Sequence, residues 1–154
     1  MLASACQWES VAELLKEAGL RDLLVAYWEE LGPYKGVAPL APDFDTMMKW
    51  EQEGQYRVWV ARVGGALAGM IGFQTVPHLH YCTTSFAIDM GHYLSPAYRG
   101  KGLLGIKMWA SACAALKELG VKIVIAHDNA VHPLDSFFER LGFEARSTLF
   151  WKSL

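Results

Sequence analysis

A glycine-rich segment in the second half of the chain carries the residues best suited to bind a ligand. It reads Tyr93-Leu-Ser-Pro-Ala-Tyr-Arg-Gly-Lys-Gly-Leu-Leu-Gly105, between a run of β-forming residues and a helical pattern. The start of a helix has about four backbone N–H groups without partners inside the helix, at the positive end of its dipole. Glycines let phosphate oxygens approach these donors closely, and Arg99 and Lys101 add charge. The segment therefore predicts a pyrophosphate site.

The charge distribution supports a polyanion site at this place and nowhere else. The net charge is −2, which gives no general attraction to nucleic acid or to an anionic membrane, so we expect neither as a partner. Residues 95–107, in contrast, hold Arg99, Lys101 and Lys107 and no acidic residue. A solvated helix start would carry the same charges, so the glycine pattern has to support the prediction as well.

The elements that position this segment follow from hydrophobic periodicity. The pattern predicts helices over residues 10–19, 20–31 and 43–50, then strands over 55–63, 66–76 and 83–94, a helix over 100–119, a strand over 121–126 covered on both faces, a helix over 133–141 and a closing strand over 145–152. This order predicts one domain over residues 1–154, of the α/β (α+β) class. Its mixed, mostly antiparallel central sheet would carry helices on both faces.

Composition agrees with an intracellular globular protein. Hydrophobic residues make up 53% of the chain and charged residues 19%, which is enough apolar material for a continuous core. The three cysteines (Cys6, Cys82 and Cys113) are odd in number and widely spaced, as expected in a reducing compartment. Neither a secretion signal nor an apolar run long enough to span a membrane is visible, so we expect a cytoplasmic protein.

Two nucleotide-binding patterns can be compared with the loop. Gly100-x-Gly102-x-x-Gly105 matches the dinucleotide fingerprint, and the acidic Asp128 follows the next predicted strand. In that fingerprint, however, the glycines follow the strand directly, whereas here five residues (95–99) intervene. A P-loop is excluded because no Gly-Lys-Ser/Thr occurs. A nicotinamide-dinucleotide site therefore stays as the weaker alternative.

Two blocks of the sequence resemble the GNAT superfamily of N-acyltransferases. The loop Pro96-Ala-Tyr-Arg-Gly-Lys-Gly-Leu-Leu104 is similar to the family's Arg/Gln-x-x-Gly-x-Gly/Ala pattern, with Leu104 in place of the usual Gly or Ala. Phe137-Phe-Glu-Arg-Leu-Gly-Phe143 is similar to the end of a family helix. The resemblance covers roughly residues 55–150. The histidine-rich stretch 77–81 and the Leu-Phe-Trp-Lys ending also resemble small phage members, for which the host cytoplasm would be the location.

The resemblance implies the GNAT fold, acetyl-CoA as cosubstrate, and transfer of an acetyl group to an amine of a small molecule or peptide. Homodimers are common in the family, and nothing in the sequence chooses between a monomer and a dimer. The implied cofactor contacts are the backbone of His92, Tyr93 and Leu94 for the pantetheine arm, the loop residues Arg99, Gly100, Lys101, Gly102, Leu103, Leu104 and Gly105 for the pyrophosphate, and Asn129.

The acid and base of the reaction are harder to locate. The tyrosine that often serves as the acid in this family is Phe138 here, and no glutamate lies in the strand 121–126. Asp89 and His127 are the remaining catalytic candidates, and an imidazole has the right intrinsic pKa for base work. Each would also suit a purely structural role, and direct transfer with water as proton shuttle is an alternative. The absence of both the usual tyrosine and the usual glutamate also suggests a CoA-binding module without catalysis.

The pair His78-x-His80 could place two metal ligands on one strand face. No third ligand is spaced to join them, so we expect no metal.

Overall fold

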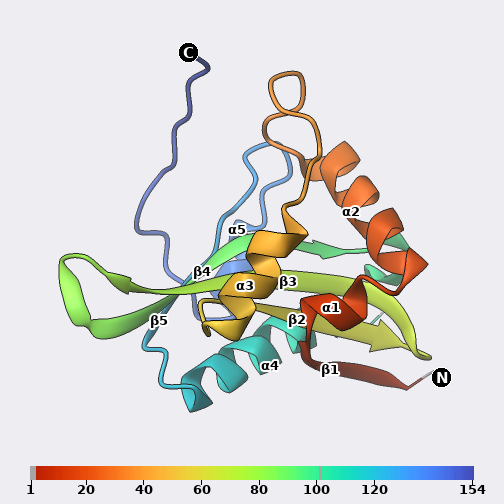
Figure 1. Ribbon diagram of the computed structural model, residues 1–154, viewed down its shortest axis with the longest axis horizontal. Helices are drawn as coiled ribbons and strands as arrows, with labels where there is room; N and C mark the ends of the chain where they lie inside the picture. The colour runs from red at the N-terminus through yellow and green to blue at the C-terminus, as the bar shows by residue number, and fades with distance from the viewer. Residues whose placement is uncertain (1–2, 101) are drawn as a thin grey trace.

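The computed structural model describes residues 3–100 and 102–154. A five-stranded sheet forms its centre, with strand order β1-β2-β3-β4-β5. β1 to β4 are antiparallel neighbours, and β5 runs parallel to β4. The mixed, mostly antiparallel sheet predicted from the sequence is thereby confirmed (Figure 1). The strands are β1 (Ser4–Glu9), β2 (Tyr56–Val63), β3 (Ala66–His78), β4 (Tyr81–Leu94) and β5 (Ile123–Ile125).

Helices cover both faces of this sheet, as predicted. Side chains alternate across a strand, and β2 shows the division clearly. Val58 and Val60 pack with the helices that precede β2, whereas Trp59 and Ala61 pack with those that follow β4. The first face carries α1 (Val11–Leu14), α2 (Ala18–Leu31) and α3 (Phe44–Gln52), and the second carries α4 (Leu104–Glu118) and α5 (Asp135–Arg140).

The strand β1 was not predicted from the sequence. Its six residues, Ser-Ala-Cys-Gln-Trp-Glu, are too few and too polar to show a clear period. In the structure, antiparallel pairing with β2 holds them, and the Trp8 ring packs edge-on against Trp59 at 4.7 Å between centroids. A long-range contact, rather than local propensity, makes this segment a strand.

The first helix is shorter than predicted. The Ser10 hydroxyl accepts a hydrogen bond from the Glu13 N–H at 3.2 Å, so the expected N-terminal cap is confirmed. The helix nevertheless ends at Leu14, and the predicted stop at Gly19 is wrong because Gly19 lies inside α2. Glycine weakens a helix by only about 1 kcal/mol, which tertiary packing of Leu20 and Leu23 outweighs here.

Two predictions about the end of the chain are wrong. β5 is not covered on both faces, since Ile123 and Ile125 are 42% and 37% exposed at the edge of the sheet. The closing strand over residues 145–152 does not form, because that segment pairs with no strand in the described part of the chain. It extends away from the sheet instead (Figure 1), and Trp151 packs edge-on against Tyr34 at 5.6 Å between centroids.

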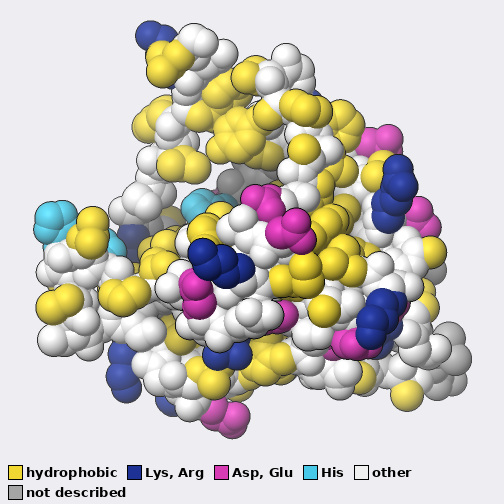
Figure 2. Space-filling view, in the orientation of Figure 1, with side chains coloured by type: hydrophobic (Ala, Val, Ile, Leu, Met, Phe, Trp, Pro, Cys, Tyr) yellow, Lys and Arg dark blue, Asp and Glu magenta, His cyan; other side chains and the backbone are white. Residues whose placement is uncertain are grey.

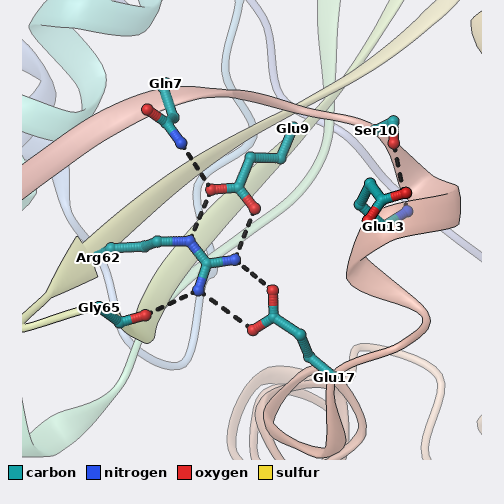
Figure 3. A network of polar contacts seen from close by, with 7 residues as sticks. All are labelled: Gln7, Glu9, Ser10, Glu13, Glu17, Arg62 and Gly65. Atoms are coloured by element: carbon teal, nitrogen blue, oxygen red, sulfur yellow. Dashed lines mark hydrogen bonds and ion pairs between the residues drawn. The ribbon is translucent and has the colours of Figure 1, made fainter.

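An ion-pair network fastens the edge of the sheet to the helical layer (Figure 3). Arg62 of β2 donates from Nε and Nη2 to both carboxylate oxygens of Glu9 in β1, each at 2.6 Å. The same guanidinium also bonds Glu17, between α1 and α2, and the Gly65 carbonyl. These contacts fix where the helices start relative to the strands. Within residues 3–100 and 102–154, no helix combines the length and the hydrophobicity needed to cross a membrane.

Candidate active site

β4 and β5 separate about halfway along β4. They pair at only three positions, the last of which joins Ile88 to Ile125. Beyond it β4 continues to Leu94 with β3 as its partner, while no strand of the described chain lies along its other edge. Backbone groups between Asp89 and Leu94 that have no partner in the protein can therefore pair with an extended ligand along that edge.

A β-bulge marks the start of the free edge. Phe73 pairs with Asp89 and Gly72 pairs with Gly91, so Met90 is an extra residue in β4. Gly91 has φ 148°, a value that favours glycine. A carboxylate oxygen of Asp89 accepts the Gly91 N–H at 2.7 Å and holds the bulge in place.

Asp89 and His127, the two predicted catalytic residues, lie together at this bulge. Asp89 is only 1% exposed, and its second carboxylate oxygen lies 2.6 Å from Nδ1 of His92. His127, just past β5, places its Nδ1 2.6 Å from the Asp89 carbonyl oxygen. The position of the His92 side chain beside this pair could not be predicted from the sequence, because residues 89 and 92 share a face only when a bulge intervenes.

These contacts fix the tautomer of His127. A carbonyl oxygen can only accept, so Nδ1 of His127 carries the hydrogen and, in the neutral ring, Nε2 keeps a free lone pair. His127 is exposed, so this lone pair can reach a substrate. His92 differs in its surroundings, since its ring packs edge-on against Trp109 and Phe138 at 5.2 and 5.7 Å between centroids. Of the two, His127 has the geometry of a general base.

The glycine-rich loop follows the free edge of β4 directly. After a turn of 3-10 helix (Pro96–Tyr98), Gly100 and Gly102 have φ values of 67° and 83°, and no atom lies within 4 Å of where their side chains would be. α4 then begins without a side-chain cap on its first N–H groups. A helix start with uncapped amides, approached over open glycines, fits a pyrophosphate group.

Two loop residues have structural partners that the sequence did not reveal. Arg99 donates to the Leu94 carbonyl at 2.7 Å and forms a two-pronged ion pair with Glu30 of α2 at 2.6 and 2.9 Å. Leu104, the departure from the family pattern, is 7% exposed and packs in the core between the sheet and α4. Lys101 lies outside the described residues.

The Arg99–Glu30 pair shifts the acid–base behaviour of the residues around it. The hydrogen bonds from Arg99 hold the pKa of Glu30 below its usual value, and burial raises the pKa of Tyr93, whose hydroxyl donates to Glu30 at 2.8 Å. Arg99 thereby ties α2 to the end of β4, next to the loop.

Asn129 connects the region beyond β5 to the helical layer. Its side-chain amide donates to the Leu31 carbonyl at 3.0 Å, and its side-chain oxygen accepts the Val131 N–H at 2.8 Å. The residue thus ties the chain beyond β5 to the end of α2. His78 and His80, the histidine pair considered for a metal, lie at the far tip of the β3–β4 hairpin, and the described residues hold no group of three metal-ligating side chains.

Comparison with known proteins identifies the family. The family model described as "Acetyltransferase (GNAT) family" matches residues 18–143. The chain belongs to this family. The predicted resemblance is confirmed, and with it the prediction of an acyl-CoA-dependent N-acetyltransferase. No curated protein sequence matches the chain significantly.

Solved structures, among them two proteins named as acetyltransferases, share the fold over nearly the whole chain. An aminoglycoside acetyltransferase from an uncultured soil sample, in complex with sisomicin, superimposes with a TM-score of 0.74 at 17% identity, covering 98% of this chain and 96% of the other. A glucosamine-6-phosphate N-acetyltransferase from Arabidopsis thaliana gives 0.73 at 15% identity, covering 98% of both chains. A transcriptional regulator from Bacillus halodurans C-125 gives 0.76 at 20% identity, covering 99% and 100%.

Proposed function

We propose that this GNAT acetyltransferase binds acetyl-CoA along the free edge of β4 and at the start of α4, and that it acetylates an amine of a small molecule or peptide. One observation supports the proposal above all. The separation of β4 from β5 after Ile88, the bulge at Gly91 and the uncapped start of α4 follow one another along a single stretch of chain.

Backbone groups would make the proposed contacts with acetyl-CoA, and the charged side chain of Arg99 would have a different role. Backbone groups of His92 and Tyr93 would pair with the pantetheine arm, while the Leu94 carbonyl already accepts from Arg99. The N–H groups from Gly100 to Gly105 would hold the pyrophosphate. Glu30 already neutralises the Arg99 guanidinium. We therefore assign the guanidinium to holding the shape of the loop, and the backbone N–H groups of the loop to binding the pyrophosphate.

The reaction needs a base for the amine and a proton for the leaving sulfur. The amine nitrogen attacks the thioester carbonyl carbon, the carbon–sulfur bond breaks, and the nitrogen gives up one proton. Nε2 of His127 would accept that proton, since its Nδ1 hydrogen is committed to the Asp89 carbonyl. The protonated ring can then return it to the thiolate, which makes a tyrosine at position 138 unnecessary. Asp89, buried and fully bonded, would act as a positioning residue.

The acceptor is proposed to be a polar amine. The structural relatives include proteins named for acetylation of aminoglycosides and of glucosamine 6-phosphate, both of which carry amino groups on sugars. The acidic first third of this chain, whose helices cover one face of the sheet, suits an acceptor with positive charge. A homodimer and a cytoplasmic location stay as predictions.

Calorimetric titration with CoA tests the cofactor site. We expect binding to the wild type and a loss of at least tenfold in affinity in Gly102→Glu, because the new carboxylate would stand where phosphate oxygens should lie. Gly120→Glu is a matched control, since Gly120 has a similar φ of 86° and equally open surroundings at the other end of α4. Absence of CoA binding in the wild type, or equal affinity in all three proteins, would refute the proposal.

A CoA-binding module without catalysis is the alternative, and the phenylalanine at position 138 is what favours it. Release of free thiol from acetyl-CoA, followed in the presence of amines, distinguishes the two. Binding with no amine-dependent thiol release would favour the module.

A further inference from the structure

A cavity of about 320 Å³ lies at the end of the sheet remote from the glycine-rich loop. Polar residues of the sheet and apolar residues at the end of α4 line it, among them Arg57, Thr83, Thr84, Ser85, Leu119 and Val121. The β3–β4 hairpin projects past α4 and β5 at this end (Figure 1). At roughly 3.3 Å per residue, β4 covers about 25–30 Å between Ser85 and Leu94, so the cavity is separate from the proposed pyrophosphate site.

Arg57 brings an uncompensated positive charge to this cavity. Strand alternation puts it on the same face of β2 as Trp59, toward α4. A Cβ on Gly54 would have Nη2 of Arg57 as its nearest atom, at 3.8 Å, so the guanidinium lies beside the turn before β2. Among the described residues, Arg57 forms no ion pair. Glu51, which precedes it, instead accepts the Val11 N–H with both carboxylate oxygens at 3.2 Å.

An insertion in β4 places hydroxyl groups next to this charge. Pro77 pairs with Ser85, but the next pair toward the hairpin tip joins His78 to Tyr81, so residues 82–84 have no partner in β3. Extra residues of this kind bend a strand and redirect its side chains. Thr83, Thr84 and Ser85 line the cavity, and within residues 3–100 and 102–154 their hydroxyls form no hydrogen bond. These hydroxyls are free to donate to a ligand.

The end of α4 does not oppose an anion here. The last carbonyls of a helix carry partial negative charge unless they are capped. Gly120, with φ 86°, donates to the Lys117 carbonyl at 3.0 Å, and Val121 donates to the Leu116 carbonyl at 3.1 Å. Figure 2 also shows basic side chains on the surface just below the projecting hairpin, whose cyan histidines mark its tip.

We propose that this cavity is a second ligand site, which binds a small phosphate monoester. The Arg57 guanidinium would bond two phosphate oxygens with its parallel N–H groups, and the hydroxyls of β4 would donate to the remaining lone pairs. The cavity is larger than one phosphate group needs. Leu119 and Val121 offer apolar surface to the organic part of the ligand. A carboxylate has fewer acceptor positions for this donor set and should bind more weakly.

Calorimetric titration with glycerol 3-phosphate tests the site in protein saturated with CoA, so that the glycine-rich loop is occupied. We expect binding to the wild type and an affinity about 10- to 100-fold lower in Arg57→Met, the loss of a hydrogen-bonded charge. Arg140→Met should bind as the wild type does, since Arg140 is an exposed arginine on α5. Glycerate, the corresponding carboxylate, should bind more weakly than the phosphate.

Two variants that keep the charge test the hydroxyls and stay informative if Arg57→Met does not fold. Ser85→Ala and Thr83→Val should each lower the affinity about three- to tenfold, the loss of one neutral hydrogen bond. Wild-type affinity in these two variants and in a folded Arg57→Met would overturn the site. Glycerate that binds as tightly as glycerol 3-phosphate would overturn its assignment to phosphate.

Competition separates this inference from the acetyltransferase proposal. Loss of glycerol 3-phosphate binding in the presence of CoA would place the phosphate at the glycine-rich loop and overturn the second site, while leaving the cofactor site intact. If the wild type does not bind CoA, the acetyltransferase proposal fails instead. The titration is then made with Gly102→Glu protein, whose loop carries a repelling carboxylate, and Arg57→Met in that background decides the second site.

Discussion

Asp89 shows how a single buried carboxylate can organise the groups around it. One of its oxygens holds the bulge amide, the other holds His92, and its own carbonyl orients His127. A charged group that is 1% exposed is tolerated only because these partners satisfy it. The residue therefore links the backbone geometry of the bulge to the orientation of both histidine rings.

Replacement of Asp89 with Asn should separate these roles. The amide keeps the size but can no longer accept hydrogen bonds at both positions, so we expect a loss of about 1–3 kcal/mol in the free energy of unfolding. We also expect a lower kcat, because the Gly91 N–H and the His92 ring would lose acceptors that hold the bulge beside His127. Urea unfolding measures the first effect and steady-state kinetics the second. An unchanged kcat together with reduced stability would assign Asp89 a structural role alone.

Removal of the His127 ring tests the base directly. His127→Ala should lower kcat by about 10²–10⁴-fold, because the variant has no ring nitrogen to accept the proton of the amine. His80→Ala provides the control, since His80 is also exposed but lies at the far tip of the β3–β4 hairpin. Equal activity of the two variants would exclude His127 as the base.

At the scale of the elements, the bulge in β4 has effects on both faces of the sheet. It turns His92 toward Trp109 and, on the other face, leaves Gly91 beneath Tyr27. The early end of β5 then exposes the edge of β4 at the same level. One inserted residue thus brings together an open edge, a histidine cluster and a pair of glycines.

The fit between Tyr56 and Gly72 can be measured by a double-mutant cycle. Gly72→Ala alone should destabilise the protein by about 1–3 kcal/mol, because its Cβ would overlap the Tyr56 hydroxyl oxygen at 2.5 Å. In a Tyr56→Phe background that oxygen is gone and the nearest ring carbon lies at 3.2 Å, so the same substitution should cost less. Chemical denaturation of the four proteins gives the coupling free energy. Additive effects would show that the two residues do not meet.

For the molecule as a whole, the Arg62 network is the main electrostatic link between the strand edge and the helical layer. Hydrogen bonds from Arg62 hold the pKa of Glu9 below its ordinary value of 4.5, against the opposing effect of burial. A carboxylate whose pKa is lower in the folded state stabilises the fold at pH values above its unfolded pKa. That stabilisation is lost as the pH falls through the folded pKa.

Arg62→Met should therefore destabilise the protein by about 2–4 kcal/mol at pH 7, since it leaves mostly buried carboxylates without a partner. The difference from wild type should shrink at pH values well below 4.5, where Glu9 is protonated in both proteins. Urea titrations at several pH values measure this. Arg146→Met is the control, because the Arg146–Glu144 pair is exposed and should contribute less than about 1 kcal/mol. A pH-independent difference would refute the assignment.

Much of this architecture was predictable from the sequence because local patterns determine it. Periodicity gave the helices over α2, α3 and α4 and the long strands β2 to β4, and the loop Pro96–Leu104 with the block Phe137–Phe143 indicated the family. The strand β1 and the unpaired end of the chain could not be predicted, since strand formation depends on a partner distant in sequence.

The sequence by itself determined the family, the sheet class and the glycine-rich loop, because glycine spacing and hydrophobic period are properties of neighbouring residues. Only the tertiary structure decided that His92 joins Asp89 and His127, that Glu30 takes up the charge of Arg99, and that Tyr27 lies over Gly91 and Tyr56 over Gly72. Each of these contacts depends on the β4 bulge or on the packing of α2 against β4. Both arise from pairing and packing between segments that lie far apart along the chain.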